Sequence, residues 1–414
     1  MSFGKFAVDY EERINFDRLR KERLERAQKQ LAQDGFGSIM TFSADNIRYL
    51  TSIYITTPNR PGEYQFVFCP RKGDPTFHGS PNLEEANKRM PWLKGRVRPN
   101  LGSGPAASDL GADSGTIQRQ VDAVIELMEE AGVRDEPIGI DGTVLSAHYV
   151  EAFARRGITC KIAKSTMDKA RMIKTVDEIS IMRMVAANTE FAFAPIVEAI
   201  RPGVREMDLV GIGIKALYEQ GCDHTEDLVC MSGYNTNPYN WTFTDRPIRP
   251  GDLVYIDVDG ASYLGYKSCV YRTFCCGKAT DKQKATYDQA LGWLRDAIAA
   301  CKPGNTNYDI GRAFPQDPAV WGHKDWSSID PYCVAHGLGL SLHDRPFVAK
   351  TYMDNKGPEV ELQPGMVLAV ETYAGMKGER DGVRLEEMVL ITENGPEVLS
   401  KFPIDKLMEC WLPY

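Results

Sequence analysis

Hydrophobic and polar positions follow a helical period and a strand period in turn along the first part of the 414-residue chain. Leu24, Ala27 and Leu31 recur at the spacing of one helical face, and this predicts a charged helix that ends near Asp34 and Gly35. An acidic amphipathic run predicts a second helix over 115–132. Short apolar runs predict strands at 37–42, 63–69 and 137–142. The alternation of helices and strands predicts an α/β domain.

A helix start and a change of pattern suggest a domain boundary near residue 165. Thr175 and Glu178 have the spacing of a capping box, and Ile179, Met182 and Ala186 would form the buried stripe of the helix behind it. After residue 250 most segments read as strands separated by turns. Those strands are predicted at 253–260, 271–277, 366–375 and 382–392. We therefore expect two domains, 1–165 and 166–414.

Composition and charge narrow the class of partner. The 43% apolar content is enough for two cores, and the net charge of -8 without any long Lys/Arg run argues against nucleic acid or a membrane surface as partner. The charged N-terminal segment does not resemble a signal peptide, and no apolar run reaches membrane-spanning length. Ten scattered cysteines fit a reducing compartment. We expect a cytoplasmic protein with a small-molecule substrate.

The second half carries residues that could bind a metal. Asp257 and Asp259 stand two apart in a predicted strand, so both carboxylates would point to one face. Further candidates lie at strands or Gly-rich turns: Cys269, His336, His343, Glu371, Glu386 and Glu387. Carboxylates with one imidazole suit one or two divalent transition-metal ions such as iron, zinc or manganese. The alternative is structural, with the aspartates capping turns, His336 in the core and Glu371 paired with Arg384.

The order of these residues, together with the segments SADNIRYLTSIY and ARMIKTVDEISIMR, resembles the pita-bread family of creatinases, prolidases and aminopeptidase P. The resemblance covers nearly the whole chain. It implies an α/β N-terminal creatinase-like domain, then an α+β pita-bread catalytic domain, in a homodimer. The ligands it implies are Asp257 or Asp259 from the first strand, Cys269 at the position on the second, His336, Glu371 and Glu386 rather than Glu387, and both aspartates are kept as candidates.

Two positions depart from the peptidases of that family. Asn240 stands where they keep a histidine that donates a proton, and Cys269 stands where an aspartate bridges two metal ions. A thiolate is a good zinc ligand, so Cys269 could still bind metal, or it could be a small buried hydrophobic residue. His343 falls where the peptidases keep a second histidine that moves protons.

The chain also resembles the dimethylsulfoniopropionate lyases built on the same fold, in the segments IDVDGASYLGY and NTNPYNW. Tyr239, Trp241 and Phe243 could form an aromatic cage for a sulfonium group, or simply pack as a strand. Tyr239, Asn240 and Trp241 are the expected substrate contacts. The first hypothesis is a metal-dependent lyase that releases dimethyl sulfide and acrylate, with His343 or Asp344 as base.

Two other hypotheses belong to different classes. One is hydrolysis of a C–N bond, as by an Xaa-Pro peptidase, a creatinase or an ectoine hydrolase. The histidine loop has the length found in the peptidases, which favours hydrolysis, whereas Asn240 weakens it. The other is a catalytically inactive binding module, whose sign would be the loss of most ligands.

Overall fold

The computed structural model describes residues 14–54, 65–79, 82–102, 115–326 and 333–412. The chain divides into two compact units, Met1–Arg171 and Met172–Tyr414. The limits expected from sequence, 1–165 and 166–414, stay predictions.

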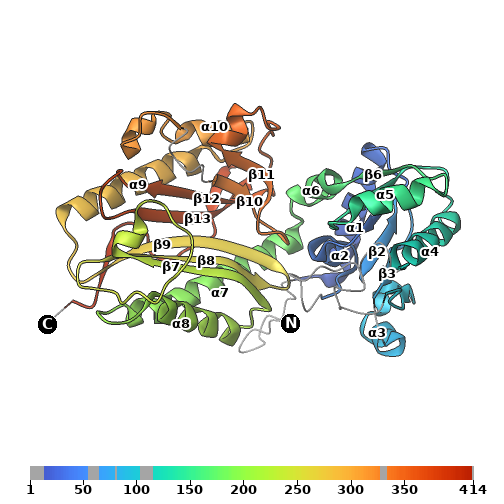
Figure 1. Ribbon diagram of the computed structural model, residues 1–414, viewed down its shortest axis with the longest axis horizontal. Helices are drawn as coiled ribbons and strands as arrows, with labels where there is room; N and C mark the ends of the chain where they lie inside the picture. The colour runs from blue at the N-terminus through green and yellow to red at the C-terminus, as the bar shows by residue number, and fades with distance from the viewer. Residues whose placement is uncertain (1–13, 55–64, 80–81, 103–114, 327–332, 413–414) are drawn as a thin grey trace. The chain divides into compact units, whose positions relative to one another are not determined.

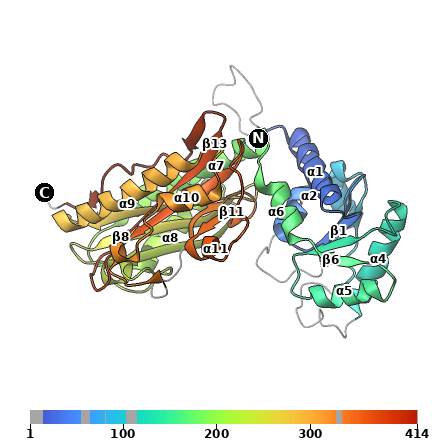
Figure 2. The same ribbon diagram turned by 90° about the horizontal axis from the view of Figure 1, so that it is seen from above.

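The N-terminal unit is an α/β layer structure around one mixed sheet with the strand order β4-β3-β2-β1-β5-β6. Strand β1 pairs antiparallel with β2 and parallel with β5, which is the mixed pairing of an α/β domain. Figures 1 and 2 show the helices of this unit packed around the sheet. Its elements are α1 (Phe16–Gln33), β1 (Ser38–Thr41), α2 (Ala44–Thr51), β2 (Phe66–Pro70), β3 (Thr76–His78), α3 (Leu83–Arg89), η1 (Pro91–Leu93), β4 (Val97–Arg98), α4 (Thr116–Glu130), β5 (Ile138–Asp141), α5 (Ser146–Ala154), β6 (Cys160–Ile162) and α6 (Lys164–Met172).

Helix α1 illustrates how the predicted pattern becomes structure. It begins after Asn15, whose side-chain oxygen accepts a hydrogen bond from the backbone N–H of Arg18 at 3.0 Å and so caps the helix. Ala27 and Leu31 are fully buried, as the spacing predicted, while Leu24 is half-buried. The strand predicted at 63–69 begins at Phe66. Its first two positions, 63 and 64, lie outside the described residues.

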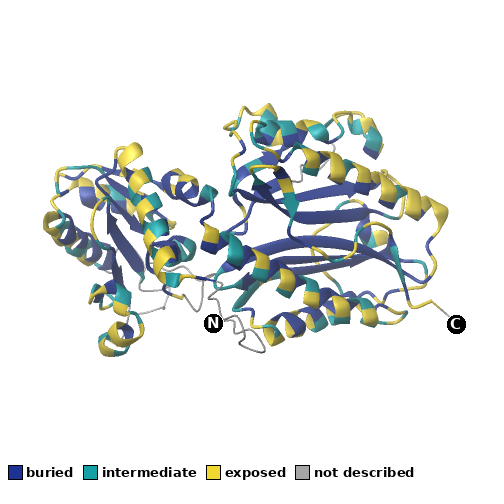
Figure 3. Ribbon diagram, turned by 180° about the vertical axis from the view of Figure 1, so that it is seen from behind, coloured by how far each residue is buried: buried dark blue, intermediate teal, exposed yellow. Residues whose placement is uncertain are grey.

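The C-terminal unit contains two sheets, with strand orders β15-β9-β8-β7 and β11-β10-β12-β13-β14. In Figures 1 and 2, α7 and α8 cover the sheet of β7, β8 and β9, and α9 and α10 cover the sheet of β12 and β13. Figure 3 shows that the strands of both sheets are buried and that the helices expose their outer faces. The elements are α7 (Val176–Ala199), α8 (Glu206–Glu219), β7 (His224–Ser232), η4 (Gly233–Thr236), β8 (Leu253–Tyr263), β9 (Tyr266–Cys276), α9 (Asp281–Ala300), α10 (Asn307–Ala313), η5 (Pro318–Trp321), β10 (Cys333–Gly337), β11 (Asp344–Ala349), α11 (Lys350–Asp354), β12 (Val367–Ala374), β13 (Val383–Thr392), β14 (Gly395–Val398) and β15 (Met408–Cys410).

The capping box predicted at the start of α7 is present. The Glu178 carboxylate accepts from the Thr175 backbone N–H at 2.8 Å, and the Thr175 hydroxyl accepts from the Glu178 N–H at 3.2 Å. The buried stripe differs in part from the prediction, because Ile181 is fully buried whereas Ile179 is half-buried. Because α7 packs against a sheet, it buries a wider face than the three predicted positions, and that face includes Ile181. Within the described ranges, no helix is both long and apolar enough to cross a membrane.

Strands β8 and β9 form a long hairpin, and two backbone features set its register. Leu264 and Gly265 both have positive φ (51° and 80°), as a two-residue type I′ turn requires. Near the middle, Gly260 (φ 72°) is an extra residue between the pairs Asp259 with Cys269 and Ala261 with Ser268. A Cβ on Gly260 would meet Glu226 Cβ at 2.6 Å, so glycine is needed for this bulge.

Candidate metal centre

The pairing of strands brings the candidate ligands together. Asp257 and Asp259 lie on the same face of β8, and Asp259 pairs directly with Cys269 on β9. In the other sheet, Glu371 on β12 pairs directly with Glu386 on β13. Because residues that face each other on neighbouring strands have close Cβ atoms, each pair presents two polar groups at one point.

Hydrogen bonds hold β9 against β13, so the two ligand pairs meet. The Thr273 hydroxyl donates to the Arg384 carbonyl at 2.6 Å and accepts from the Arg384 N–H at 3.0 Å. One guanidinium nitrogen of Arg272 donates to the Glu386 carbonyl at 2.6 Å. These bonds join strands of different sheets at the level of the candidate site.

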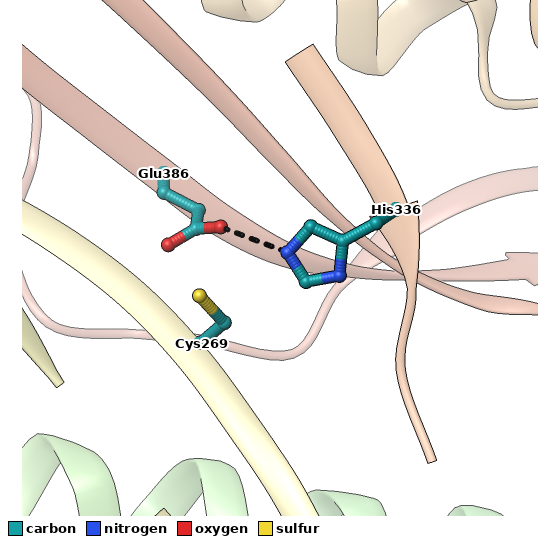
Figure 4. Close-up of side chains that lie close together, drawn as sticks. All are labelled: Cys269, His336 and Glu386. Carbon is teal, nitrogen blue, oxygen red and sulfur yellow. Dashed lines mark ion pairs between the residues drawn. The ribbon is translucent and has the colours of Figure 1, made fainter. Parts of the chain in front are cut away.

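Two groups of three side chains could each hold a metal ion. They are Asp257, Asp259 and Cys269, and Cys269, His336 and Glu386, and within each group the ligand atoms all lie within 4.8 Å of one another. Figure 4 shows the second group, with the Cys269 sulfur pointing toward the Glu386 carboxylate and a dashed line from that carboxylate to the imidazole. The distance from His336 Nε2 to Glu386 Oε1 is 3.9 Å. All five side chains are at most 3% exposed.

His336 is oriented as a metal ligand would be. Its Nδ1 lies 3.1 Å from the carbonyl oxygen of Gly337. A carbonyl can only accept, so Nδ1 carries the proton and Nε2 has a free lone pair that faces Glu386. Burial lowers the pKa of His336 to about 3, with a smaller contribution from His343, so the ring is neutral at pH 7.

Several polar atoms of the cluster have no hydrogen-bond partner among the described residues: Asp257 Oδ2, His336 Nε2 and both carboxylate oxygens of Glu386. An unpaired buried polar atom costs about 1–3 kcal/mol, and more when it is charged. These lone-pair donors belong to the two adjoining groups, and one or two divalent cations would satisfy them. The residues present therefore fit a metal ion.

The electrostatics of the cluster agree with this. Burial raises the pKa of Asp257 well above its ordinary value, and the nearby Asp259 and Glu386 carboxylates add to the shift. Burial likewise raises the pKa of Glu386, with Glu371 and Asp259 as further causes. Burial also raises the pKa of the Cys269 thiol, and the nearby Asp259 carboxylate adds to that shift. Each group would lose its proton more readily beside a cation.

Glu371 lies beside the cluster but has a protein partner. The Arg384 guanidinium pairs with Glu371 Oε2, and both side chains are buried. The pairing named in the structural alternative is thus present. Burial raises the pKa of Glu371, while Arg384 opposes that shift.

Arg384 and Tyr271 are two neighbours of the site that pattern reasoning did not select for function. The Arg384 guanidinium carbon lies 3.9 Å from the ring centre of Tyr271 and 4.3 Å from that of Tyr239. Arg384 is two residues before Glu386 on β13, and Tyr271 is two residues after Cys269 on β9, so each shares the face of a candidate ligand. The spacing of two residues from a candidate ligand was the sequence signal that could have identified Arg384 and Tyr271 as neighbours of the site.

Neighbouring glutamates on β13 have opposite environments. Glu386 faces the cluster, whereas Glu387 pairs with Arg272 at 2.9 Å and accepts from the Ser400 hydroxyl. Successive strand residues point to opposite faces, which explains the difference. Glu386 therefore lies among the candidate ligands, whereas Glu387 has its own partners in Arg272 and Ser400.

His343 and Asp344 flank the cluster. The His343 ring centre lies 4.4 Å from that of His336. Although residue 343 as a whole is exposed, desolvation of its ring lowers its pKa, Lys267 adds to the effect and Glu226 opposes it. Asp344 is buried at the start of β11, and its carboxylate lies against Gly339 beside Lys174.

The three aromatic side chains at 239, 241 and 243 differ in their surroundings. One face of Tyr239 is covered by Arg384, whereas Trp241 and Phe243 are 46% and 40% exposed. Asn240 is exposed, its carbonyl accepts from the Tyr255 hydroxyl, and its side-chain oxygen accepts from the Trp241 N–H at 2.8 Å. Among the three expected substrate contacts, Tyr239 packs against Arg384, which in turn pairs with Glu371.

Family models match both halves of the chain. Metallopeptidase family M24 matches residues 180–393, and the creatinase/prolidase N-terminal domain matches residues 23–173. An Xaa-Pro dipeptidase of Pyrococcus furiosus is 30% identical over 288 residues, which are 68% of this chain and 78% of that protein. The chain belongs to metallopeptidase family M24, so the resemblance to creatinases and prolidases is confirmed. The narrower likeness to the lyases is not supported by these relatives.

Solved structures agree on the fold. An Xaa-Pro dipeptidase from Bacillus anthracis superposes with a TM-score of 0.74 at 24% identity and covers 94% of this chain and 99% of its own. Dipeptidase PepE from Mycobacterium ulcerans gives 0.75 at 22% identity, with 95% and 98% covered. The predicted fold class, an α/β creatinase-like domain followed by an α+β pita-bread domain, is confirmed.

Proposed function

We propose that this protein is a metal-dependent hydrolase that cleaves a C–N bond in a small dipeptide-like substrate. The observation that carries the proposal is the set of unpartnered buried atoms on Asp257, His336 and Glu386 within an M24 domain. The similarity to a protein named Xaa-Pro dipeptidase makes an Xaa-Pro dipeptide the substrate to test first. The relatives thus favour hydrolysis over the lyase reaction that the sequence suggested first.

One or two ions would be held by Asp257 and Asp259 in one group and by His336 and Glu386 in the other, with Glu371 beside them. A divalent ion there supplies Lewis acidity, which polarises a carbonyl oxygen and lowers the pKa of water. The Gly337 carbonyl keeps His336 Nε2 free to bind, and the Arg384 guanidinium orients the Glu371 carboxylate. Burial of these side chains excludes bulk water from the ligand atoms.

His343 is the candidate for proton transfer. Its lowered pKa keeps the imidazole neutral at pH 7, so Nδ1 or Nε2 can accept a proton and later return it to the leaving nitrogen. Its exposure lets it meet a substrate, while its contact with His336 places it next to the candidate ligands. Asp344 is buried and raises the pKa of His336, so we assign it a supporting electrostatic role.

A lyase acting on dimethylsulfoniopropionate is the second candidate. Asn240 favours it, because an asparagine cannot donate a proton as the peptidase histidine does at that position. The covered face of Tyr239 and the exposure of Trp241 weigh against an aromatic cage for its sulfonium group. Hydrolysis is therefore the first choice.

The test compares the two reactions on one metal-replete preparation. Release of proline from an Xaa-Pro dipeptide, lost on chelation, would support the hydrolase. Dimethyl sulfide from dimethylsulfoniopropionate without any proline release would instead support the lyase. Neither product from protein shown to contain metal would reject both named substrates and leave hydrolysis of another C–N bond or the inactive binding module.

Matched variants tie any activity to the cluster. Glu386→Gln keeps shape and removes the charge of a candidate ligand, whereas Glu393→Gln makes the same change at an exposed position just after β13. Activity lost in the first variant and kept in the second assigns the reaction to this site. Wild-type activity in both variants would show that the reaction does not depend on Glu386.

The assembly and location that the sequence suggested remain proposals. A homodimer should have about twice the 46.3 kDa mass of the chain, and light scattering measures this directly. A monomer mass would remove the dimer. The cytoplasmic location would be tested by fractionation of the source cells.

A further inference from the structure

The Cys269 thiol belongs to both groups of candidate ligands. It joins Asp257 and Asp259 on β8 in one group and His336 and Glu386 in the other. Its sulfur lies 3.3 Å from Asp259 Oδ1 and 3.9 Å from Asp257 Oδ1. Figure 4 shows the same sulfur directed toward the Glu386 carboxylate. Cys269 is therefore the member common to the two groups.

Other buried cysteines in the described part of the chain have different surroundings. Cys301 donates to the Ala297 carbonyl at 3.4 Å within helix α9, among apolar residues of the core. Cys69 contacts the Pro70 carbonyl at 3.5 Å. A cysteine that only fills space needs no polar neighbours. Cys269 instead faces carboxylates and an imidazole that themselves include unpartnered atoms.

We propose that Cys269 binds the metal as a thiolate shared by both groups, and that this sulfur gives the site a preference for zinc over manganese. This inference rests on the metal centre of the proposed function. On binding, the S–H bond is replaced by a sulfur–metal bond and the proton passes to solvent, so no oxidant or reductant is needed. One ion in either group is bound by the thiolate, and two ions would share it.

The preference follows from ligand chemistry. Thiolates suit zinc, whereas sites made of carboxylates and water suit manganese and magnesium. The other members of the two groups are carboxylates and one imidazole, which both metals accept. One sulfur at the shared position therefore affects every ion that the cluster holds.

X-ray absorption at the zinc edge tests the bond without any mutation. Full-length protein loaded with zinc should show a Zn–S shell near about 2.3 Å, distinct from Zn–N and Zn–O shells near about 2.0–2.2 Å. A spectrum fitted by nitrogen and oxygen shells alone, on protein that contains zinc, would overturn the proposal. The proposed hydrolase would survive that outcome, because it requires a metal and not a sulfur ligand.

Variants then test the preference. Wild type, Cys269→Asp and the control Cys301→Ala are dialysed against equal zinc and manganese, and both metals are counted. Loss of a residue that only hydrogen-bonds to a metal ligand already costs about 10–100-fold in affinity. Exchange of the thiolate ligand itself should have at least as large an effect, so we expect the zinc-to-manganese ratio to fall by at least about tenfold in Cys269→Asp. Cys301→Ala should match wild type. An unchanged ratio in a folded Cys269→Asp protein would contradict the proposal.

Cobalt loading gives a separate reading of the thiolate. Wild type and Cys301→Ala should show a sulfur-to-cobalt charge-transfer band that chelation removes, and Cys269→Asp should bind cobalt without it. Proline release is measured on the same samples. A band without proline release would keep the thiolate ligand and reject Xaa-Pro hydrolysis, whereas proline release without a band would support hydrolysis and overturn the thiolate ligand.

Discussion

Glu206 and Glu386 are two buried carboxylates of the C-terminal unit that differ in their hydrogen-bond partners. Glu206 is fully buried and accepts hydrogen bonds from the backbone N–H and the hydroxyl of Ser232 and of Thr244, at 2.7–2.9 Å. Glu386 is equally buried, yet neither of its oxygens has a hydrogen-bond partner among the described residues. Burial alone therefore does not mark a site. A buried carboxylate whose oxygens have no protein partner requires a proton or a cation.

Removing the carboxylate of Glu386 should have the largest effect on activity. Glu386→Ala deletes a candidate ligand, and a metal supplies several kcal/mol of transition-state stabilisation, so we expect turnover to fall by about 10³-fold. Turnover on the assigned substrate and metal content per chain would be measured together. Full metal content with full turnover would remove Glu386 from the site.

The opposite result is expected at Glu206. Glu206→Ala leaves the buried donors of Ser232 unsatisfied and removes the partner of the half-buried donors of Thr244, so at about 1–3 kcal/mol for each buried donor the free energy of unfolding should fall by roughly 3 kcal/mol. Metal content and turnover of the folded fraction should stay at the wild-type level. Urea denaturation measures the free energy of unfolding. A Glu206→Ala variant as stable as wild type would contradict the structural role that separates Glu206 from Glu386.

His343 should affect turnover without affecting binding of the metal. General acid–base catalysis contributes about 10²–10⁴-fold, so we expect His343→Ala to lose about 10²-fold in turnover at unchanged metal content. His148→Ala, at an exposed position in α5, is the matched control. Wild-type turnover in His343→Ala would exclude the proposed proton transfer.

The pH dependence of stability should separate the chelated protein from the metal-bound one. Burial raises the pKa of Asp257 and of Glu386, so the folded chelated protein keeps protons that the unfolded chain has lost, and stability falls as pH rises toward those raised values. His336 has the opposite sign. Burial lowers its pKa to about 3, so its contribution is lost as pH falls and is complete above the ordinary histidine pKa.

From about pH 6.5 up to the raised pKa values of the two carboxyls, their effect on stability remains, at roughly 1.4 kcal/mol per pH unit for each retained proton. Urea denaturation of chelated protein across this range should show the decline. Bound metal should flatten it, and Glu386→Gln should make it shallower. A free energy of unfolding that rises with pH in this window would contradict the assignment.

Much of the site could be read from local pattern. Asp257 and Asp259 share a face because strand side chains alternate, and the same rule separates Glu386 from Glu387. Glu371 and Arg384 were paired in the structural alternative, and they do form an ion pair. What alternation could not reveal is that this ion pair lies beside the candidate ligands, with Tyr239 and Tyr271 against the guanidinium.

The choice between C–N hydrolysis and the lyase reaction was the part of the function that sequence pattern predicted least well. The aromatic spacing at 239–243 suggested a cage, whereas in the folded chain Trp241 and Phe243 remain exposed. Alternation states which residues share a face but not what covers that face. The relatives named as dipeptidases then changed the preferred reaction, although Asn240 and Cys269 still depart from the peptidase pattern.

Residue order and periodicity alone were enough for the order of the two folds and the helix cap at Thr175, and they supplied the candidate ligands that stay predictions. These depend on contacts a few residues apart and on one recurring order of motifs. The meeting of β8–β9 with β12–β13, the shared position of the Cys269 sulfur and the unpartnered oxygens of Glu386 appear only in the folded chain. They depend on contacts between distant residues, since Cys269 is 67 positions from His336 and 117 from Glu386, which no local spacing encodes.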